Sequence, residues 1–114
     1  MPKRKQTILK GLPASPGVCR GEAVIVMSWD QLGRVRDQSV LVTRTSEPDM
    51  FPALFKVIGV VTDTGGITSH AASNARELGL PCVVGTSTAT QVIRDGDLVT
   101  VNGTVGEVLV EKRD

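Results

Sequence analysis

Residues 60–72 read VVTDTGGITSHAA, and this stretch decides how the rest of the chain is interpreted. The run over residues 57–61 is apolar and β-branched, which is typical of a buried strand. The pair Gly65-Gly66 ends that run, and glycine permits a positive φ or a close approach of the backbone to a ligand. The stretch therefore predicts a strand, a glycine turn and the start of a helix.

The helix is expected to begin after an N-cap at Thr68 or Ser69 and to end at Leu78, because Gly79 and a nearby proline stop it. Alanines and a leucine at i, i+4 and i+7 form an apolar face that should pack on the sheet. The opposite face carries four polar residues, which are His70, Ser73, Asn74 and Glu77. His70 is therefore predicted to point away from the core.

His70 is the one histidine of the chain, and it stands where a helix N-terminus favours an anion. At neutral pH an unperturbed imidazole is mostly neutral and keeps a nitrogen lone pair for attack. A phosphoryl group received there would find hydrogen-bond donors already in place. These features suit a phosphoryl-accepting nucleophile, and the alternative is a surface histidine without a role.

The motif GGITSHAA at residues 65–72, followed by ARELGLPCVVG at residues 75–85, resembles the phosphohistidine, or swivelling, domain of phosphoenolpyruvate (PEP)-utilising enzymes. That family includes pyruvate phosphate dikinase, PEP synthase and enzyme I of the sugar phosphotransferase system. Its histidine is phosphorylated in turnover, so the resemblance implies that His70 is the catalytic residue. The similarity extends to residues 11–17 and 95–103 and covers nearly the whole chain.

The residues around His70 are expected to support the phosphoryl group. Gly65 and Gly66 bring the backbone close, while Thr68 and Ser69 offer hydroxyl and N–H donors. In the dikinase and synthase relatives, the threonine two places before the histidine is also a regulatory phosphorylation site. The resemblance therefore implies Thr68 as a regulatory candidate.

Arg44 follows an apolar strand at residues 40–43 and precedes a loop of capping residues. Its guanidinium could form a fork on the phosphoryl oxygens. The alternative is a solvated arginine, or one paired with Asp49. Asp49 could instead cap a short helix in which Phe51, Leu54 and Phe55 form one apolar face, with both phenylalanines in the core.

Hairpins mixed with strand–helix–strand units predict an α/β fold. The resemblance implies a three-layer β/β/α swivelling domain, with a mostly parallel central sheet, helices on one face and hairpin strands on the other. Strands at 98–101 and 105–110 flank Asn102-Gly103, a sequence typical of a two-residue type I′ turn. Residues 12–17, with two prolines and a glycine, are expected to form a loop.

The chain has 114 residues, formal net charge +1, 40% hydrophobic residues and 22% charged residues. This composition suits one soluble domain over residues 7–114, preceded by a basic flexible tail at residues 1–6. We expect no nucleic-acid partner, no membrane association and a cytoplasmic location. Cys19 and Cys82 match no zinc pattern, so no metal site is expected.

Relatives also carry a nucleotide-binding or carrier-binding domain and a PEP-binding barrel, for which this chain has no room. We expect those to be partner domains or subunits that hold Mg, ATP or PEP, while this domain binds no cofactor. The chain is then one component of a transferase rather than a complete enzyme, either as a fragment or as a separate carrier. The alternative is a binding or regulatory module that kept the fold without turnover.

Overall fold

The computed structural model describes residues 6–45 and 48–112, and the statements below concern those ranges. The expected tail at residues 1–6 lies outside them except for Gln6, which is already part of a strand. The side chains of residues 48–50 are also outside the description. Both roles expected for Asp49 therefore stay predictions.

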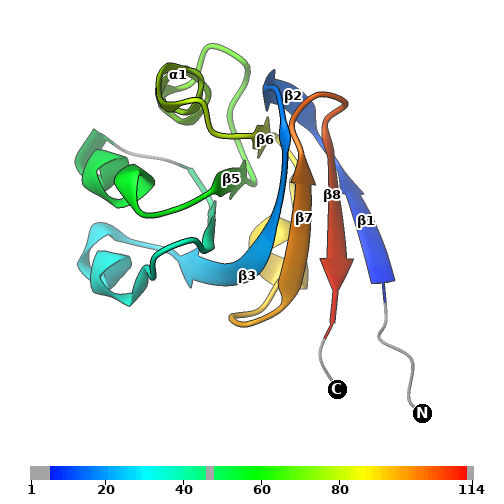
Figure 1. The fold of residues 1–114 in the computed structure, drawn as a ribbon, viewed down its shortest axis with the longest axis horizontal. Helices are drawn as coiled ribbons and strands as arrows, with labels where there is room; N and C mark the ends of the chain where they lie inside the picture. The colour runs from blue at the N-terminus through cyan, green and yellow to red at the C-terminus, as the bar shows by residue number, and fades with distance from the viewer. Residues whose placement is uncertain (1–5, 46–47, 113–114) are drawn as a thin grey trace.

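Eight strands form one sheet in the order β1-β8-β7-β3-β4-β5-β6-β2 (Figure 1). Valine is common in these strands, because its branched Cβ suits a pleated backbone. The strand bounds are β1 Gln6–Lys10, β2 Leu12–Ser15, β3 Val18–Val26, β4 Val40–Thr43, β5 Gly59–Thr62, β6 Cys82–Val84, β7 Leu98–Asn102 and β8 Glu107–Glu111.

The sheet has a parallel part and an antiparallel part. Strands β3, β4, β5 and β6 pair in parallel, whereas β1 with β8, β8 with β7, β7 with β3 and β6 with β2 pair antiparallel. The α/β class is confirmed, but the whole sheet is mixed rather than mostly parallel. The reason lies in β3, whose first half pairs with the hairpin strand β7 and whose second half pairs with β4.

The helices are few and short. They are the α-helices α1 (His70–Leu78) and α2 (Ala89–Val92) and the 3-10 helices η1 (Trp29–Arg34) and η2 (Pro48–Phe55). Helix α1 ends at Leu78 as predicted, because Gly79 takes a left-handed φ of 72° and the N–H of Leu80 donates to the carbonyl of Ala75 at 2.8 Å.

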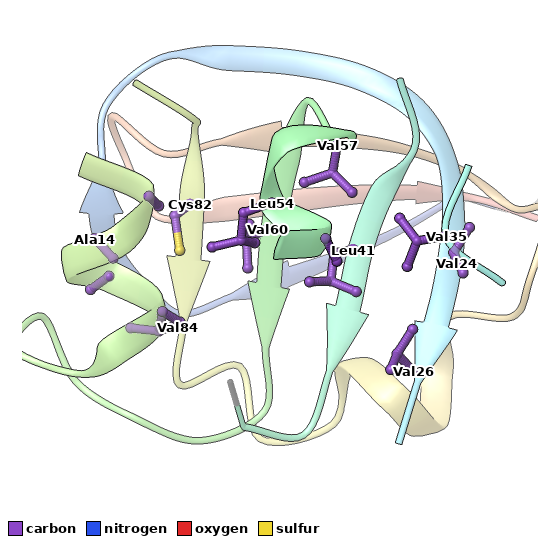
Figure 2. Close-up of a cluster of buried hydrophobic side chains, with 14 residues drawn as sticks. Ala14, Val24, Val26, Val35, Leu41, Leu54, Val57, Val60, Cys82 and Val84 are labelled. Carbon is purple, nitrogen blue, oxygen red and sulfur yellow. The ribbon is translucent and has the colours of Figure 1, made fainter. Parts of the chain in front are cut away.

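Two apolar clusters lie on opposite faces of the parallel strands, because successive side chains of a strand alternate in direction. In β4, Leu41 belongs to one cluster while Val40 and Val42 belong to the other. The first cluster joins the parallel strands to α1, η1 and η2 (Figure 2). The second joins them to β7, β8 and α2. Helix α1 is therefore fixed by its buried face, which leaves its other face to solvent.

Residues 12–15 form the edge strand β2 and not the loop that was expected. Proline is tolerated in an edge strand because only one side of the strand needs ladder hydrogen bonds. Pro13 lies opposite Val83 of β6, and the register shifts between Pro13 and Ser15. The pairing partner is about seventy residues away in sequence, so local turn signals could not reveal it.

The predicted hairpin is present, but its turn has four residues, 103–106, and not two. The left-handed residue is Gly106, with φ of 82°, and not Gly103. Asn102 explains the difference: its Oδ1 accepts hydrogen bonds from the amides of Thr104 and Val105 at 3.1 and 3.2 Å. This side chain closes a longer turn than the Asn-Gly pair indicates.

Phe55 is 68% exposed, so its expected place in the core is wrong. Leu54 is buried and Phe51 packs on the first cluster, as predicted. The segment is a 3-10 helix, in which residues i and i+3 share a face but i+4 does not. The α-helical spacing used for the prediction therefore placed Phe55 on the buried side of the helix. Its ring instead stands edge-on to that of Phe51, with the ring centroids 5.3 Å apart.

Candidate functional site

The parallel strands β4, β5 and β6 end at one edge of the sheet, where ligands of open α/β sheets bind. Hydrogen bonds join the residues at these ends. The amide of Asp63 donates to the carbonyl of Thr43 at 3.1 Å, and the amide and hydroxyl of Thr86 donate to the carbonyl of Thr62 at 3.1 and 2.9 Å. These hydrogen bonds therefore fix the ends of the strands from which the loop before His70 starts.

Asp63 anchors that loop, a role that the sequence analysis missed. Asp63 is only 8% exposed, and its carboxylate accepts hydrogen bonds from the amide and hydroxyl of Thr90 at 2.9 and 2.5 Å. The N–H of Ser87 also donates to the Asp63 carbonyl at 2.9 Å. Asp63 thus ties the end of β5 to the start of α2. A polar residue directly after a buried strand was the available signal.

The glycine turn takes its positive φ at Gly65, with a value of 104°. A Cβ on Gly65 would lie 3.2 Å from the Cβ of Ser69. Gly66 has no positive φ, and a Cβ there would meet nothing within 4 Å. The two glycines therefore differ: Gly65 makes the turn possible, while Gly66 leaves open space beside it.

Ser69, and not Thr68, is the N-cap of α1. Its Oγ accepts a hydrogen bond from the amide of Ala72 at 3.3 Å, and its backbone is extended, with φ of −66° and ψ of 165°. Thr68 is exposed, and its hydroxyl has no hydrogen-bond partner among the described residues. Of the two expected cap positions, the second is confirmed.

His70 is the first residue of α1 and is exposed, as predicted from the helix faces. Ala71, Ala72 and Ala75 form the buried face. The amides of residues 65–68 have no hydrogen-bond acceptor within the described part of the chain. His70 therefore follows a row of unpaired N–H donors, at the helix end where the dipole favours negative charge.

Arg44 is exposed and directly follows β4. Its carbonyl accepts hydrogen bonds from the amide and hydroxyl of Thr64, both at 3.0 Å. Because Thr64 directly precedes Gly65, these bonds fix the backbone of Arg44 beside the glycine turn. Its guanidinium has no partner among the side chains that the structure describes, which do not include that of Asp49. The backbone of Arg44 is thus held near the glycine turn.

Arg76 also touches this loop, although no sequence pattern singled it out. Its Nη1 donates to the carbonyl of Ile67 at 2.8 Å and to the carbonyl of Ala14, in β2, at 2.9 Å. Its position six residues after His70 was visible in the sequence, but its partner in β2 was not.

The described residues contain no group of three or more His, Cys, Asp or Glu side chains that could hold a metal ion. Cys82 is buried and its pKa is raised to about 12, chiefly by desolvation, with Arg76 opposing the shift. Cys82 is thus a small residue of the first apolar cluster. No helix within residues 6–45 and 48–112 is both long and apolar enough to cross a membrane.

Comparisons with known proteins identify the family of this chain. A family model described as "PEP-utilising enzyme, mobile domain" matches residues 35–106. The phosphoenolpyruvate synthase of Pyrococcus furiosus is 48% identical over 103 residues, which are 90% of this chain and 13% of that protein. A probable phosphoenolpyruvate synthase of Archaeoglobus fulgidus is 46% identical over 110 residues, covering 94% of this chain and 15% of that protein. The chain thus spans a small part of the curated relatives it matches.

A solved structure supports the same assignment. The solution structure of Enzyme I (nEIt) matches with a TM-score of 0.62 and 36% identity, over 73% of this chain and 34% of that chain. The family model, the relatives in sequence and this solved structure therefore point to the same family. This chain belongs to the mobile-domain family of PEP-utilising enzymes.

Proposed function

We propose that this chain is a phosphoryl carrier: His70 accepts a phosphoryl group at one site and delivers it at another. One observation carries the proposal. His70 is exposed at the first position of α1, directly after amides that have no acceptor in the described part of the chain. A histidine kept only for structure needs neither exposure nor unpaired donors, whereas a phosphohistidine uses both.

The chemistry follows from that geometry. A nitrogen lone pair of the neutral imidazole attacks phosphorus, and the bond from phosphorus to the leaving oxygen breaks. The negative charge of the transferred group is then stabilised by the amides of residues 65–68 and by the N-terminus of α1. The guanidinium of Arg44 is a candidate for added positive charge, since the carbonyl of Arg44 is bonded to Thr64, directly before Gly65.

The pairing of the first and last strands suits a domain that moves as a unit. Gln6 of β1 lies opposite Glu111 of β8, so the chain enters and leaves the described part at neighbouring points. Figure 1 shows α1 on the other side of the molecule from these points. This arrangement leaves the His70 face free to visit one site and then another.

The partners we propose are domains or subunits that bind a nucleotide and PEP, and that hold Mg together with ATP or PEP. The transfer then runs between a donor site and PEP or pyruvate. We base this on the length of the match, which covers only 13% of the Pyrococcus furiosus phosphoenolpyruvate synthase. The other steps of the reaction then belong to other parts of such proteins.

Thr68 is proposed as a site where phosphorylation switches the carrier off. It is exposed and lies two residues before His70, beside the unpaired amides. A phosphate there adds about −1.5 to −2 charge, which repels an incoming phosphoryl group and occupies the same donors.

Intact mass spectrometry tests the proposal. The chain is incubated with PEP or ATP plus a cell extract, or with phosphoramidate, a small donor whose P–N bond breaks with loss of ammonia. We expect one added phosphoryl group that survives alkaline pH, is lost in acid and is absent in His70→Gln. Failure of the parent chain to gain this group with any donor favours a binding or regulatory module without turnover.

A further inference from the structure

The loop before His70 is held by one arginine nitrogen. Arg76 Nη1 donates at 2.8 Å to the carbonyl of Ile67, nine residues before it, and at 2.9 Å to the carbonyl of Ala14, sixty-two residues before it. One side chain thereby joins α1, the edge strand β2 and the loop. The bond to Ala14 fixes where the guanidinium lies, so the bond to Ile67 fixes where the loop lies.

The carbonyl that Arg76 holds belongs to the central peptide group of a tight turn. The amide of Ser69 donates to the carbonyl of Gly66 at 3.0 Å, which closes a turn over residues 66–69. The central peptide group, between Ile67 and Thr68, takes no part in that closing bond. Its orientation is therefore the least constrained feature of the turn, and Arg76 supplies the missing constraint.

The orientation of this peptide group decides where an N–H donor points. The carbonyl and N–H of a trans peptide group point in opposite directions, and no peptide bond of the described chain is cis. Because the Ile67 carbonyl faces Arg76, the N–H of Thr68 points away from Arg76. That N–H has no acceptor among the described residues.

We propose that Arg76 is a positioning residue for phosphoryl transfer to His70: it holds the Ile67–Thr68 peptide group so that the Thr68 N–H is ready for a phosphoryl oxygen. This inference rests on the proposed carrier function. Arg76 acts through the loop and needs no contact with the phosphoryl group. A loop held in one orientation stabilises charge in transfer without first having to reorganise.

The test uses Arg76→Gln, Arg76→Lys and the control Arg36→Gln, which removes an exposed positive charge outside the loop. Two quantities are measured in the 114-residue chain. One is the rate of His70 phosphorylation by phosphoramidate, which needs no partner protein. The other is the NMR order parameter of the Thr68 amide, with the melting temperature recorded for each variant.

We expect Arg76→Gln to slow phosphorylation roughly tenfold to a hundredfold and to loosen the Thr68 amide. Arg76→Lys should recover part of the rate, because an ammonium group can still donate to a carbonyl, and it is the informative variant if Arg76→Gln does not fold. Arg36→Gln should match the parent.

A parent-like rate in Arg76→Gln, or a slow rate with an unchanged Thr68 amide and a lower melting temperature, overturns the positioning role. A parent chain that is never phosphorylated overturns the carrier function instead.

Discussion

Two glycine-containing turns of this molecule differ in how their amides are used. In the hairpin turn, residues 103–106, every amide has an acceptor: Gly103 donates to Gly17 at 2.8 Å, the next two donate to Asn102 Oδ1, and Gly106 donates to the Asn102 carbonyl at 2.9 Å. In the site turn, residues 65–68, no amide has an acceptor within the described part of the chain.

The surroundings of the two turns differ in the same way. A Cβ on Gly103 would lie 1.8 Å from the carbonyl oxygen of Ser15, whereas a Cβ on Gly66 would meet nothing within 4 Å. The hairpin turn is closed by the protein's own atoms, and the site turn leaves both donors and space. Unpaired polar groups are costly only when they are kept from solvent, so the amides of an open turn can bond to water at little cost and stay available to a ligand.

The largest effect that distinguishes the turns is expected from His70→Ala. Phosphorylation should be abolished, because the nucleophile is gone. The free energy of unfolding should change by no more than about 0.5 kcal/mol, since the side chain that is removed is exposed and has no partner among the described residues. Phosphate incorporation and a thermal melt measure the two quantities. A large drop in melting temperature would show that His70 supports the fold.

Thr68→Asp should come next, with a nearly complete block of His70 phosphorylation. The added carboxylate lies beside the unpaired amides, repels the phosphoryl group and competes for its donors. Thr68→Ser should react like the parent, because it keeps the hydroxyl. The initial rate of phosphorylation is measured, with circular dichroism as the folding control. If Thr68→Asp reacts as fast as the parent, the phosphoryl group does not lie at the site turn.

Alanine at Gly65 should slow phosphorylation more than alanine at Gly66. Gly65 has φ of 104°, and a side chain there costs about 1–3 kcal/mol of strain or moves the turn. Gly106→Ala in the hairpin turn should be destabilising too, because its Cβ would lie 2.7 Å from the Gly11 carbonyl oxygen. Its folded fraction should still be phosphorylated at the parent rate. A rate loss in Gly106→Ala equal to that in Gly65→Ala would remove the distinction between the turns.

The sequence predicted the features of the site that depend on neighbours in the chain. The buried and exposed faces of α1 and its end at Gly79 follow from periodicity and capping, which act over a few residues. The exposure of His70 follows from the same periodicity. These features are local, and the structure has them where they were expected.

The features that the sequence could not predict depend on distant partners. The bond from Arg76 to Ala14 and the pairing of β2 with β6 join residues more than sixty positions apart. Phe55 was misplaced because nothing local told a 3-10 helix from an α-helix. The four-residue hairpin turn depends on where the Asn102 side chain points, which an Asn-Gly pair leaves open.

Ser69→Ala should have a smaller effect that falls on stability. It removes the cap bond from Ser69 Oγ to the amide of Ala72, at a cost of about 1 kcal/mol. Thr68→Val is the matched control, because Thr68 is exposed and does not cap the helix. Its unfolding free energy should therefore stay within about 0.5 kcal/mol of the parent. Urea unfolding of the two variants gives the comparison, and the reverse order of stability would restore Thr68 as the cap.

Asn102→Ala tests the hairpin turn alone. The substitution removes the acceptor of two amides and leaves them to water, so the unfolding free energy should fall by about 1 kcal/mol. The phosphorylation rate of His70 should not change, because none of the hydrogen bonds of the hairpin turn reaches residues 65–70 in the described part of the chain. Asn102→Asp keeps an acceptor oxygen and should recover most of the stability.

Urea unfolding and the phosphoramidate rate are measured together. A slower rate in Asn102→Ala at unchanged stability would mean that the two turns are coupled through β2, and that the site turn is not an independent unit.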